Sequence, residues 1–263
     1  MHSTRSDGRL SPEEVLRRAA EGGLDVIALT DHDCAPALPP GPVRVAGRII
    51  HVLHAAEVSG CWEGREQHLL VYFRGQVPAE FARLMRSFCM ARADRYQQAA
   101  QGLGLPGLDP PEPAAMRGER ALTRVHLSEA IVATGHARDL EDAFARYTGS
   151  RLGRVPAVAP TFPAVISMAR AAGGLTSWAH PPLDAVQDHL LTFIEAGLQG
   201  LESARPGLRG QERNTLLRLA HKHGLFVTGG SDFHGFPWQR PLGQWSFPMR
   251  EARPFARALG LPA

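Results

Sequence analysis

Cysteine is scarce in this sequence, and its distribution excludes two classes of site. The chain has three cysteines, Cys34, Cys61 and Cys89, and no two of them form a Cys-x-x-Cys pair. An odd number of widely spaced thiols does not predict a disulfide framework, and a thiolate zinc site needs paired thiols. We therefore expect a protein of the reducing cytoplasm.

Long apolar runs and lysine are also lacking. No stretch approaches the roughly 18 consecutive apolar residues of a membrane span, and the first residues are polar, unlike a signal peptide. The net charge is only +3, and Lys222 is the single lysine among 29 basic residues, which indicates a base-composition bias. We expect a soluble enzyme with neither a membrane nor a stable nucleic-acid partner.

One short stretch organises the rest of the sequence. The apolar residues 26–29 end abruptly in the cluster Thr30, Asp31, His32 and Asp33. A short apolar run between turn formers is typical of a strand buried on both faces of a parallel sheet. In parallel α/β folds the ligand site lies at the carboxyl ends of the strands, so the cluster is expected to face it. The alternative is an ordinary polar turn with a capping aspartate.

Similar clusters recur along the chain, where apolar or glycine-rich runs end in metal-ligating side chains. Outside the first cluster, these candidate ligands are His2, Asp7, Glu57, His68, His180, Asp232 and His234. Imidazole and carboxylate without thiolate suit Zn, Mn or Fe. Because no single strand can supply all the ligands of several cations, we expect the clusters to converge on one multinuclear centre.

The order of expected elements indicates an α/β fold. Ser11, Pro12 and Glu14 predict a helix start, with an N-cap, a proline at the first helical position and a capping box. Strands are expected over residues 24–30, 67–73, 175–179, 200–203 and 225–229, with helices between the last three, and residues 43–58 are expected to form one or two strands around Gly47. Strand–helix alternation at this spacing predicts a parallel sheet or barrel.

An insertion interrupts the alternation. From residue 78 the apolar side chains recur at helical spacing, a stripe that is typical of core packing. Two further helices are expected near residues 123–134 and 139–147. We assign residues 77–160 to a mainly helical insertion, or cap, and residues 1–76 and 161–263 to the barrel.

Together these motifs resemble those of the PHP (polymerase and histidinol phosphatase) family of metal-dependent phosphoesterases. The resemblance spans nearly the whole chain and rests on His2-Ser3, Ser6-Asp7-Gly8, residues 29–33, Glu57, His68, Ala179-His180-Pro181 and residues 230–235. It implies a distorted (β/α)7 PHP barrel that holds two or three divalent cations, with Mn expected first and Zn, Fe or Mg as alternatives.

The resemblance also implies how the ligands are shared. One cation would be held by His2, Asp232 and a bridging Glu57. A second would be held by Asp7, His32 and His234, and a third by His68, His180 and Glu57.

Within the family, the segment Leu122-Thr123-Arg124-Val125-His126 resembles the branch of nucleoside 3′,5′-bisphosphate phosphatases, some of which trim RNA 5′ ends. This implies hydrolysis of the 3′-phosphate of a nucleotide by metal-bound hydroxide, with short oligonucleotides as further substrates. Arg124 and His126 would reach the substrate phosphates from the cap. The implied catalytic residues are His32, His126 and His234, with His126 or His234 as the general acid.

Three alternatives stay open. The substrate could be histidinol phosphate, or the chain could be a metal-binding PHP module that has lost catalysis. Arg124 and His126 could also be ordinary surface side chains of a helix.

The first residue departs from the family pattern. The family opens with a strand that ends in His-x-His, and Met1 occupies the x position here. Either the sequence starts late, or the chain is a variant whose first metal site has one imidazole fewer. Adding an upstream Asp-Leu-His is expected to tighten metal binding in a metal titration, and unchanged stoichiometry and activity would contradict this.

Overall fold

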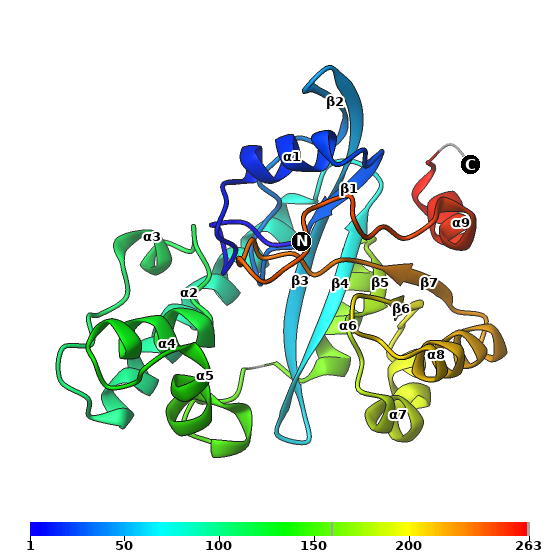
Figure 1. The fold of residues 1–263 in the computed structure, drawn as a ribbon. Coiled ribbons are helices and arrows are strands. Elements are labelled where there is room, and N and C mark those ends of the chain that lie inside the picture. The colour runs from blue at the N-terminus through cyan, green and yellow to red at the C-terminus, as the bar shows by residue number, and fades with distance from the viewer. Residues whose placement is uncertain (159, 262–263) are drawn as a thin grey trace.

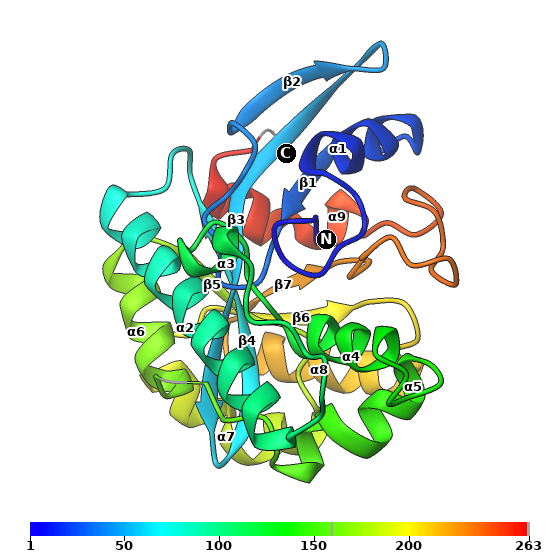
Figure 2. The same ribbon diagram turned by 90° about the vertical axis from the view of Figure 1, so that its left-hand side faces the viewer.

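The computed structural model describes residues 1–158 and 160–261, so the end of the expected barrel segment 161–263 lies outside the described residues. Its sheet of seven strands curls into a half-barrel with helices packed against it (Figures 1 and 2). The strands run in the order β1-β3-β4-β5-β6-β7, and β2 pairs with β3. Within the described part of the chain, no helix is long and apolar enough to cross a membrane.

The sequence indicated the position of every strand. The strands are β1 Val26–Leu29, β2 Gly41–Val45, β3 Arg48–Trp62, β4 Arg65–Phe73, β5 Leu175–Trp178, β6 Gly200–Ala204 and β7 Phe226–Gly229. The one or two strands expected around Gly47 are two, β2 and β3, which form a hairpin.

The sheet is mixed, so the prediction of a parallel sheet was wrong for its central strands. Parallel pairs join β1 to β3, β5 to β6 and β6 to β7, whereas β2–β3, β3–β4 and β4–β5 are antiparallel. The physical reason lies in two tight turns, Ala46-Gly47 and Glu63-Gly64, in which all four residues have positive φ. Such two-residue turns form hairpins, because a parallel connection needs a much longer crossover.

Most helices begin and end near their expected positions. They are α1 Pro12–Glu21, α2 Ala79–Leu103, α3 Pro113–Met116, α4 Arg124–Ala133, α5 Leu140–Ala143, α6 Phe162–Ala171, α7 Leu183–Glu195, α8 Gly210–Lys222 and α9 Met249–Leu259. Ser11 caps α1 by accepting a hydrogen bond from Glu14 N at 3.2 Å. The sequence did not indicate α9, because Pro254 interrupts its helical pattern.

The helices of the proposed insertion gather on one side of the long β3–β4 hairpin, and α7 and α8 lie on the opposite side (Figure 1). The first half of α2 packs into the main core through Phe81 and Met85. Its second half contributes Ala99 to a separate apolar cluster with Leu127 and Ile131 of α4. The proposed insertion therefore packs on the main core through the first half of α2 and on itself through the second half.

Three buried aromatic rings fill the main core between the sheet and its helices. Phe193 of α7 lies 4.8 Å from Trp178 of β5 and 4.9 Å from Phe162 of α6, both in edge-to-face geometry. Each ring is fully buried. This packing fixes the helices that follow the insertion against the strands that carry polar side chains at their ends.

The backbone approach of α6 to β3 depends on Gly60. A Cβ at Gly60 would lie 2.7 Å from Phe162 Cα, so Gly60→Ala is expected to destabilise the fold by about 1–3 kcal/mol through overpacking. Gly102 is the matched control, because a Cβ there meets nothing within 4 Å and alanine favours the helix by about 0.5–1 kcal/mol. Urea unfolding measures both, and a Gly60→Ala variant as stable as the wild type would contradict the prediction.

Candidate metal centre

A tight loop over residues 1–8 holds His2 inside the protein. His2 N donates a hydrogen bond to Phe233 O at 2.8 Å, which joins the loop to the segment after β7. A Cβ at Gly8 would lie 2.4 Å from His2 O, so no other residue fits there without displacing this backbone. The loop therefore presents His2 at the ends of β1 and β7.

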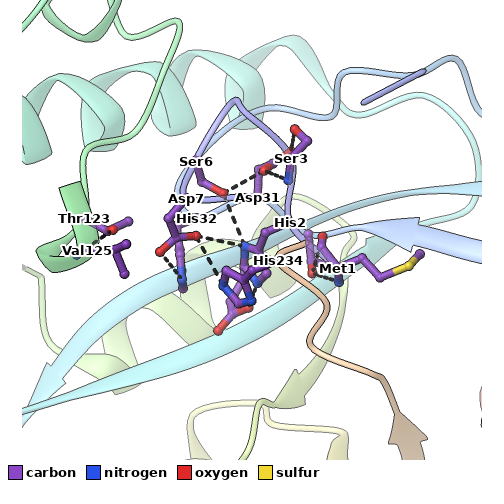
Figure 3. Close-up of polar contacts among 12 residues, drawn as sticks. Met1, His2, Ser3, Ser6, Asp7, Asp31, His32, Thr123, Val125 and His234 are labelled. Carbon is purple, nitrogen blue, oxygen red and sulfur yellow. Dashed lines mark hydrogen bonds and ion pairs between the residues drawn. The ribbon is translucent and has the colours of Figure 1, made fainter. Parts of the chain in front are cut away.

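Of the two aspartates beside His32, neither joins the group of candidate ligands. Asp31 accepts hydrogen bonds from Ser3 N at 2.7 Å and Ser6 Oγ at 2.6 Å, and so shapes the N-terminal loop (Figure 3). Asp33 accepts from Ser59 N at 2.7 Å. The sequence cluster after β1 is thus divided. Asp31 and His32 point in opposite directions because successive side chains of an extended segment do so, and Asp33 lies in a turn with φ of 51°.

Glu57 of β3 is the centre of the site. Its Oε2 lies 3.1 Å from His2 Nε2, and its Oε1 lies 2.8 Å from His68 Nδ1 and 3.0 Å from His180 Nε2. Glu57 is only 2% exposed. A buried carboxylate thus meets imidazoles from the N-terminal loop, from β4 and from the end of β5.

A second carboxylate, Asp7, collects the other imidazoles. Asp7 Oδ1 lies 3.3 Å from His234 Nε2 and 3.7 Å from His2 Nδ1, and Asp7 Oδ2 lies 3.9 Å from His32 Nε2. Figure 3 shows these side chains pointing toward one another. Asp232 completes the site, because its Oδ1 lies 3.3 Å from His2 Nε2.

The structure brings all eight expected ligands together. Within the described residues, three groups have candidate ligand atoms within 4.8 Å of one another, namely His2, Asp7, His32 and His234, then His32, Glu57 and His68, and finally His2, Glu57 and Asp232. The first and third groups contain two of the expected sets. In the second, His32 stands where His180 was expected, although His180 contacts Glu57 directly.

The electrostatics of this centre suit cations. Burial by itself raises the pKa of Asp7 and Glu57, but the surrounding imidazoles outweigh burial and hold both pKa values well below the usual range. Burial lowers the pKa of His2, but hydrogen bonds to Asp232 and Glu57 raise it to about 10. Asp7 Oδ1 and His32 Nδ1 are buried without a hydrogen bond. The ionised carboxylates fit divalent cations held by nitrogen and oxygen, and a bound cation would displace the proton from His2.

Two site residues have strained backbones. His180 and Asp232 have positive φ angles of 32° and 47°, a region that side chains with a Cβ rarely adopt. Such strain persists only where the surrounding structure holds it, and it concentrates at functional sites.

Comparison with known proteins agrees with this geometry. The chain is 31% identical over 244 residues to a 3′,5′-nucleoside bisphosphate phosphatase of Chromobacterium violaceum, a match that covers 89% of this chain and 85% of the relative. It is 32% identical over 247 residues to a 5′-3′ exoribonuclease of Haemophilus influenzae, covering 90% and 88%. The chain belongs to the PHP family of phosphoesterases.

No protein-family model matches the chain. Among solved structures, a Bifidobacterium adolescentis protein assigned as a metal-dependent phosphoesterase has a TM-score of 0.75 and 26% identity, covering 98% of this chain and 94% of that one. The expected fold class and hydrolase activity are therefore confirmed at the level of the PHP family.

On the insertion side of this PHP site lies the first turn of α4. Arg124 NH2 lies 3.9 Å from Glu66 Oε2, and Arg124 is partly exposed. His126 Nδ1 accepts a hydrogen bond from Thr123 N at 3.0 Å, which completes a capping box. Burial and then the charge of Arg120 lower the pKa of His126 to about 4. His126 is therefore neutral at physiological pH.

A buried arginine of α2 connects the insertion to the site. Arg92 is 4% exposed, and it donates to Asp33 Oδ2 at 2.5 Å and to Ser59 Oγ at 2.7 Å. It also lies 3.4 Å from Glu66 Oε1, which in turn lies 3.3 Å from His68 Nε2. Glu66 thus contacts Nε2 of His68, the nitrogen that does not face Glu57. Carboxylates orient metal-binding histidines in this way.

Glu202 at the end of β6 supports the strained backbone at His180. Its Oε2 accepts a hydrogen bond from His180 N at 2.6 Å. Burial, reinforced by nearby carboxylates, raises the pKa of Glu202 to about 7. A cavity of about 380 Å³ adjoins Glu202, Glu57 and Asp232.

Sequence reasoning missed Arg92 and Glu66, although both leave a signal. Glu66 stands two residues before His68 on a strand, so both side chains share one face. Arg92 continues the buried stripe of α2 from Met85 and Cys89 at helical spacing. An arginine in such a stripe predicts a buried carboxylate partner.

The Arg92 contacts predict a strong effect on stability. Arg92→Met would leave Asp33 and Glu66 buried with fewer partners, and we expect a loss of about 3–5 kcal/mol in the free energy of unfolding. Arg83→Met on the same helix is the matched control, because Arg83 is 71% exposed and its pairing distance to Glu80 is 4.0 Å. Its effect should stay within about 0.5 kcal/mol. Equal effects in urea unfolding would contradict the anchoring role.

Proposed function

We propose that this chain removes the 3′-phosphate from nucleoside 3′,5′-bisphosphates. The observation that carries the proposal is the convergence of buried histidines and carboxylates in adjoining groups, beside the arginines of the insertion. The name of the Chromobacterium relative supports this choice of substrate. The small nucleotide would enter from the side of the insertion, residues 77–160, which we propose as the cap.

The proposed ligands of two or three divalent cations are His2, Asp7, His32, Glu57, His68, His180, Asp232 and His234. We propose Mn as the first candidate, with Zn, Fe or Mg as alternatives, because the donors are nitrogen and oxygen only. Cations bound there would lower the pKa of water and neutralise charge on the phosphate oxygens.

Arg124 is the proposed phosphate contact. Its only carboxylate within 4 Å among the described residues is Glu66, at 3.9 Å, so its guanidinium keeps donors for a ligand. Burial lowers the pKa of Arg124, but an arginine stays cationic at physiological pH. A planar guanidinium can bind two oxygens of one phosphate.

The expected general acids were His126 and His234. His126 is neutral, its Nδ1 accepts from Thr123 N, and its Nε2 lies 3.0 Å from Arg120 NH2. Both nitrogens of His234 are engaged, Nε2 with Asp7 at 3.3 Å and Nδ1 with Asp232 O at 2.8 Å. We therefore propose that His126 holds the first turn of α4 in place, and that solvent protonates the leaving ribose oxygen.

Phosphate release tests the proposal. Mn-loaded protein is expected to release phosphate from adenosine 3′,5′-bisphosphate faster than from histidinol phosphate, with a short 5′-phosphorylated RNA assayed alongside. His180→Ala and Asp232→Ala should abolish turnover, because each removes a proposed ligand. His189→Ala is the matched control, since the partly buried His189 of α7 contacts Glu63 at 3.4 Å and lies beside the Trp62 ring, outside the candidate centre.

The outcomes separate the alternatives. Near-normal rates in His180→Ala or Asp232→Ala would contradict hydrolysis at this centre. Preference for histidinol phosphate would replace the substrate assignment. Bound metal without turnover on any of these phosphoesters would favour a PHP module without catalysis.

A further inference from the structure

Four rings form a column that leads out of the metal centre. The His2 and His234 rings stack with centroids 4.1 Å apart and planes at 14°. His234 stacks at 6.2 Å and 26° on Phe236, which stacks at 4.6 Å and 10° on Trp238. Neighbouring ring planes are close to parallel along the whole column. The rings therefore keep nearly the same orientation from the proposed ligands His2 and His234 to Trp238.

Exposure increases along this column. His2 is 1% exposed, whereas Trp238 is 71% exposed, more than any other large apolar side chain of the described residues. One face of the indole lies on Phe236, so the exposed area lies on its other face and edges. An indole this exposed contributes little to the core, and its open face is available to another planar ring.

The loop that carries the outer rings is held rigidly. Gln239 Oε1 accepts hydrogen bonds from His234 N at 2.7 Å and from Phe236 N at 3.3 Å. Gln239 Nε2 donates to Asp232 O at 3.0 Å. One side chain thus ties the proposed ligands to Phe236, on which Trp238 stacks, so the position of these two rings is set relative to the candidate metal centre.

A cation lies beside the column. The guanidinium of Arg9 lies 4.7 Å from the Phe236 ring centroid, and Arg9 also pairs with Glu129 of α4. Arg9 N donates to His234 O at 2.7 Å. We define Phe236 and Trp238 as the platform. The platform offers a flat aromatic surface, and the Arg9 guanidinium beside it is positively charged. Aromatic rings and cations together are what bind nucleic-acid bases and their phosphates.

We propose that the open face of Trp238 stacks on a nucleobase of the substrate while its scissile phosphate lies at the metal centre. This inference rests on the proposed function and adds the residue that recognises the base. Stacking accepts any base, because every base has a π face. The base can belong to the bisphosphate itself or to the next nucleotide of a short RNA, and the choice of substrate distinguishes the two.

The test measures KM and kcat of the Mn-loaded variants Trp238→Ala, Trp238→Leu and Trp238→Phe on three substrates. These are adenosine 3′,5′-bisphosphate, a 5′-phosphorylated trinucleotide RNA and glycerol phosphate, which has no base. Alanine and leucine should raise KM roughly 5- to 100-fold for a substrate whose base stacks, with kcat nearly unchanged, because stacking binds ground and transition states alike. Phenylalanine should largely restore KM, and glycerol phosphate should not respond.

Leu191→Ala provides the matched control. Leu191 of α7 is 60% exposed, so its replacement removes a comparably exposed apolar side chain outside the platform. A KM increase for the bisphosphate alone assigns the stacked base to the mononucleotide, and an increase for RNA alone assigns it to the next nucleotide. Unchanged KM in Trp238→Ala for both base-containing substrates overturns the inference while leaving the proposed function intact.

Calorimetric titration of adenosine 3′,5′-bisphosphate into the Mn-loaded protein separates the two proposals further. Binding that weakens in Trp238→Ala but not in Leu191→Ala, with no phosphate released from any nucleotide, would keep the platform and overturn the proposed function. Absence of both binding and turnover in the wild type would overturn both. A Trp238→Leu variant that binds as tightly as Trp238→Phe would contradict aromatic stacking.

Discussion

The contact of one buried carboxylate with imidazoles from distant segments is the constraint on which the rest of the site depends. Glu57 meets His2, His68 and His180 within 3.1 Å. Burying a carboxylate is costly unless charge and hydrogen bonds compensate it. The N-terminal loop, β4 and the end of β5 must therefore reach one point, and the curled sheet is the arrangement that lets them do so.

The site is bounded by two different structures whose contacts reach its ligands. On one side Arg92 and Glu66 connect α2 to His68, so the insertion and the centre share buried charges. On the other side Gln239 connects the aromatic loop to His234. Both connections act on candidate ligands through hydrogen bonds, which is how outer residues orient a metal site. The proposed substrate site therefore has charged side chains on the α2 side and aromatic side chains on the side of the loop that carries Phe236 and Trp238.

Particular residues show how far the sequence could be interpreted. The ligand set was indicated because histidines and carboxylates recur in short motifs beside apolar or glycine-rich runs. The curled sheet brings these motifs together, with Glu57 and His68 inside the antiparallel strands β3 and β4. His32 and its neighbours show the limit, since residue type could not separate the inward histidine from Asp31, which shapes a loop, or from Asp33, which pairs with Arg92. The antiparallel strands were missed because the hairpin turns begin with Ala46 and Glu63, where the usual first residue is Asn, Asp or Gly.

The sequence by itself determined the family, through the resemblance of its motifs, and it determined the positions of the strands and the chemical type of the centre, because periodicity, turn residues and ligand types are local properties. Only the tertiary structure decided the grouping of the ligands, the role of Arg92 and the ring column from His2 to Trp238. These features join residues that are far apart in the chain. Their distances depend on how the sheet curls and on how the loops pack, which no local pattern records.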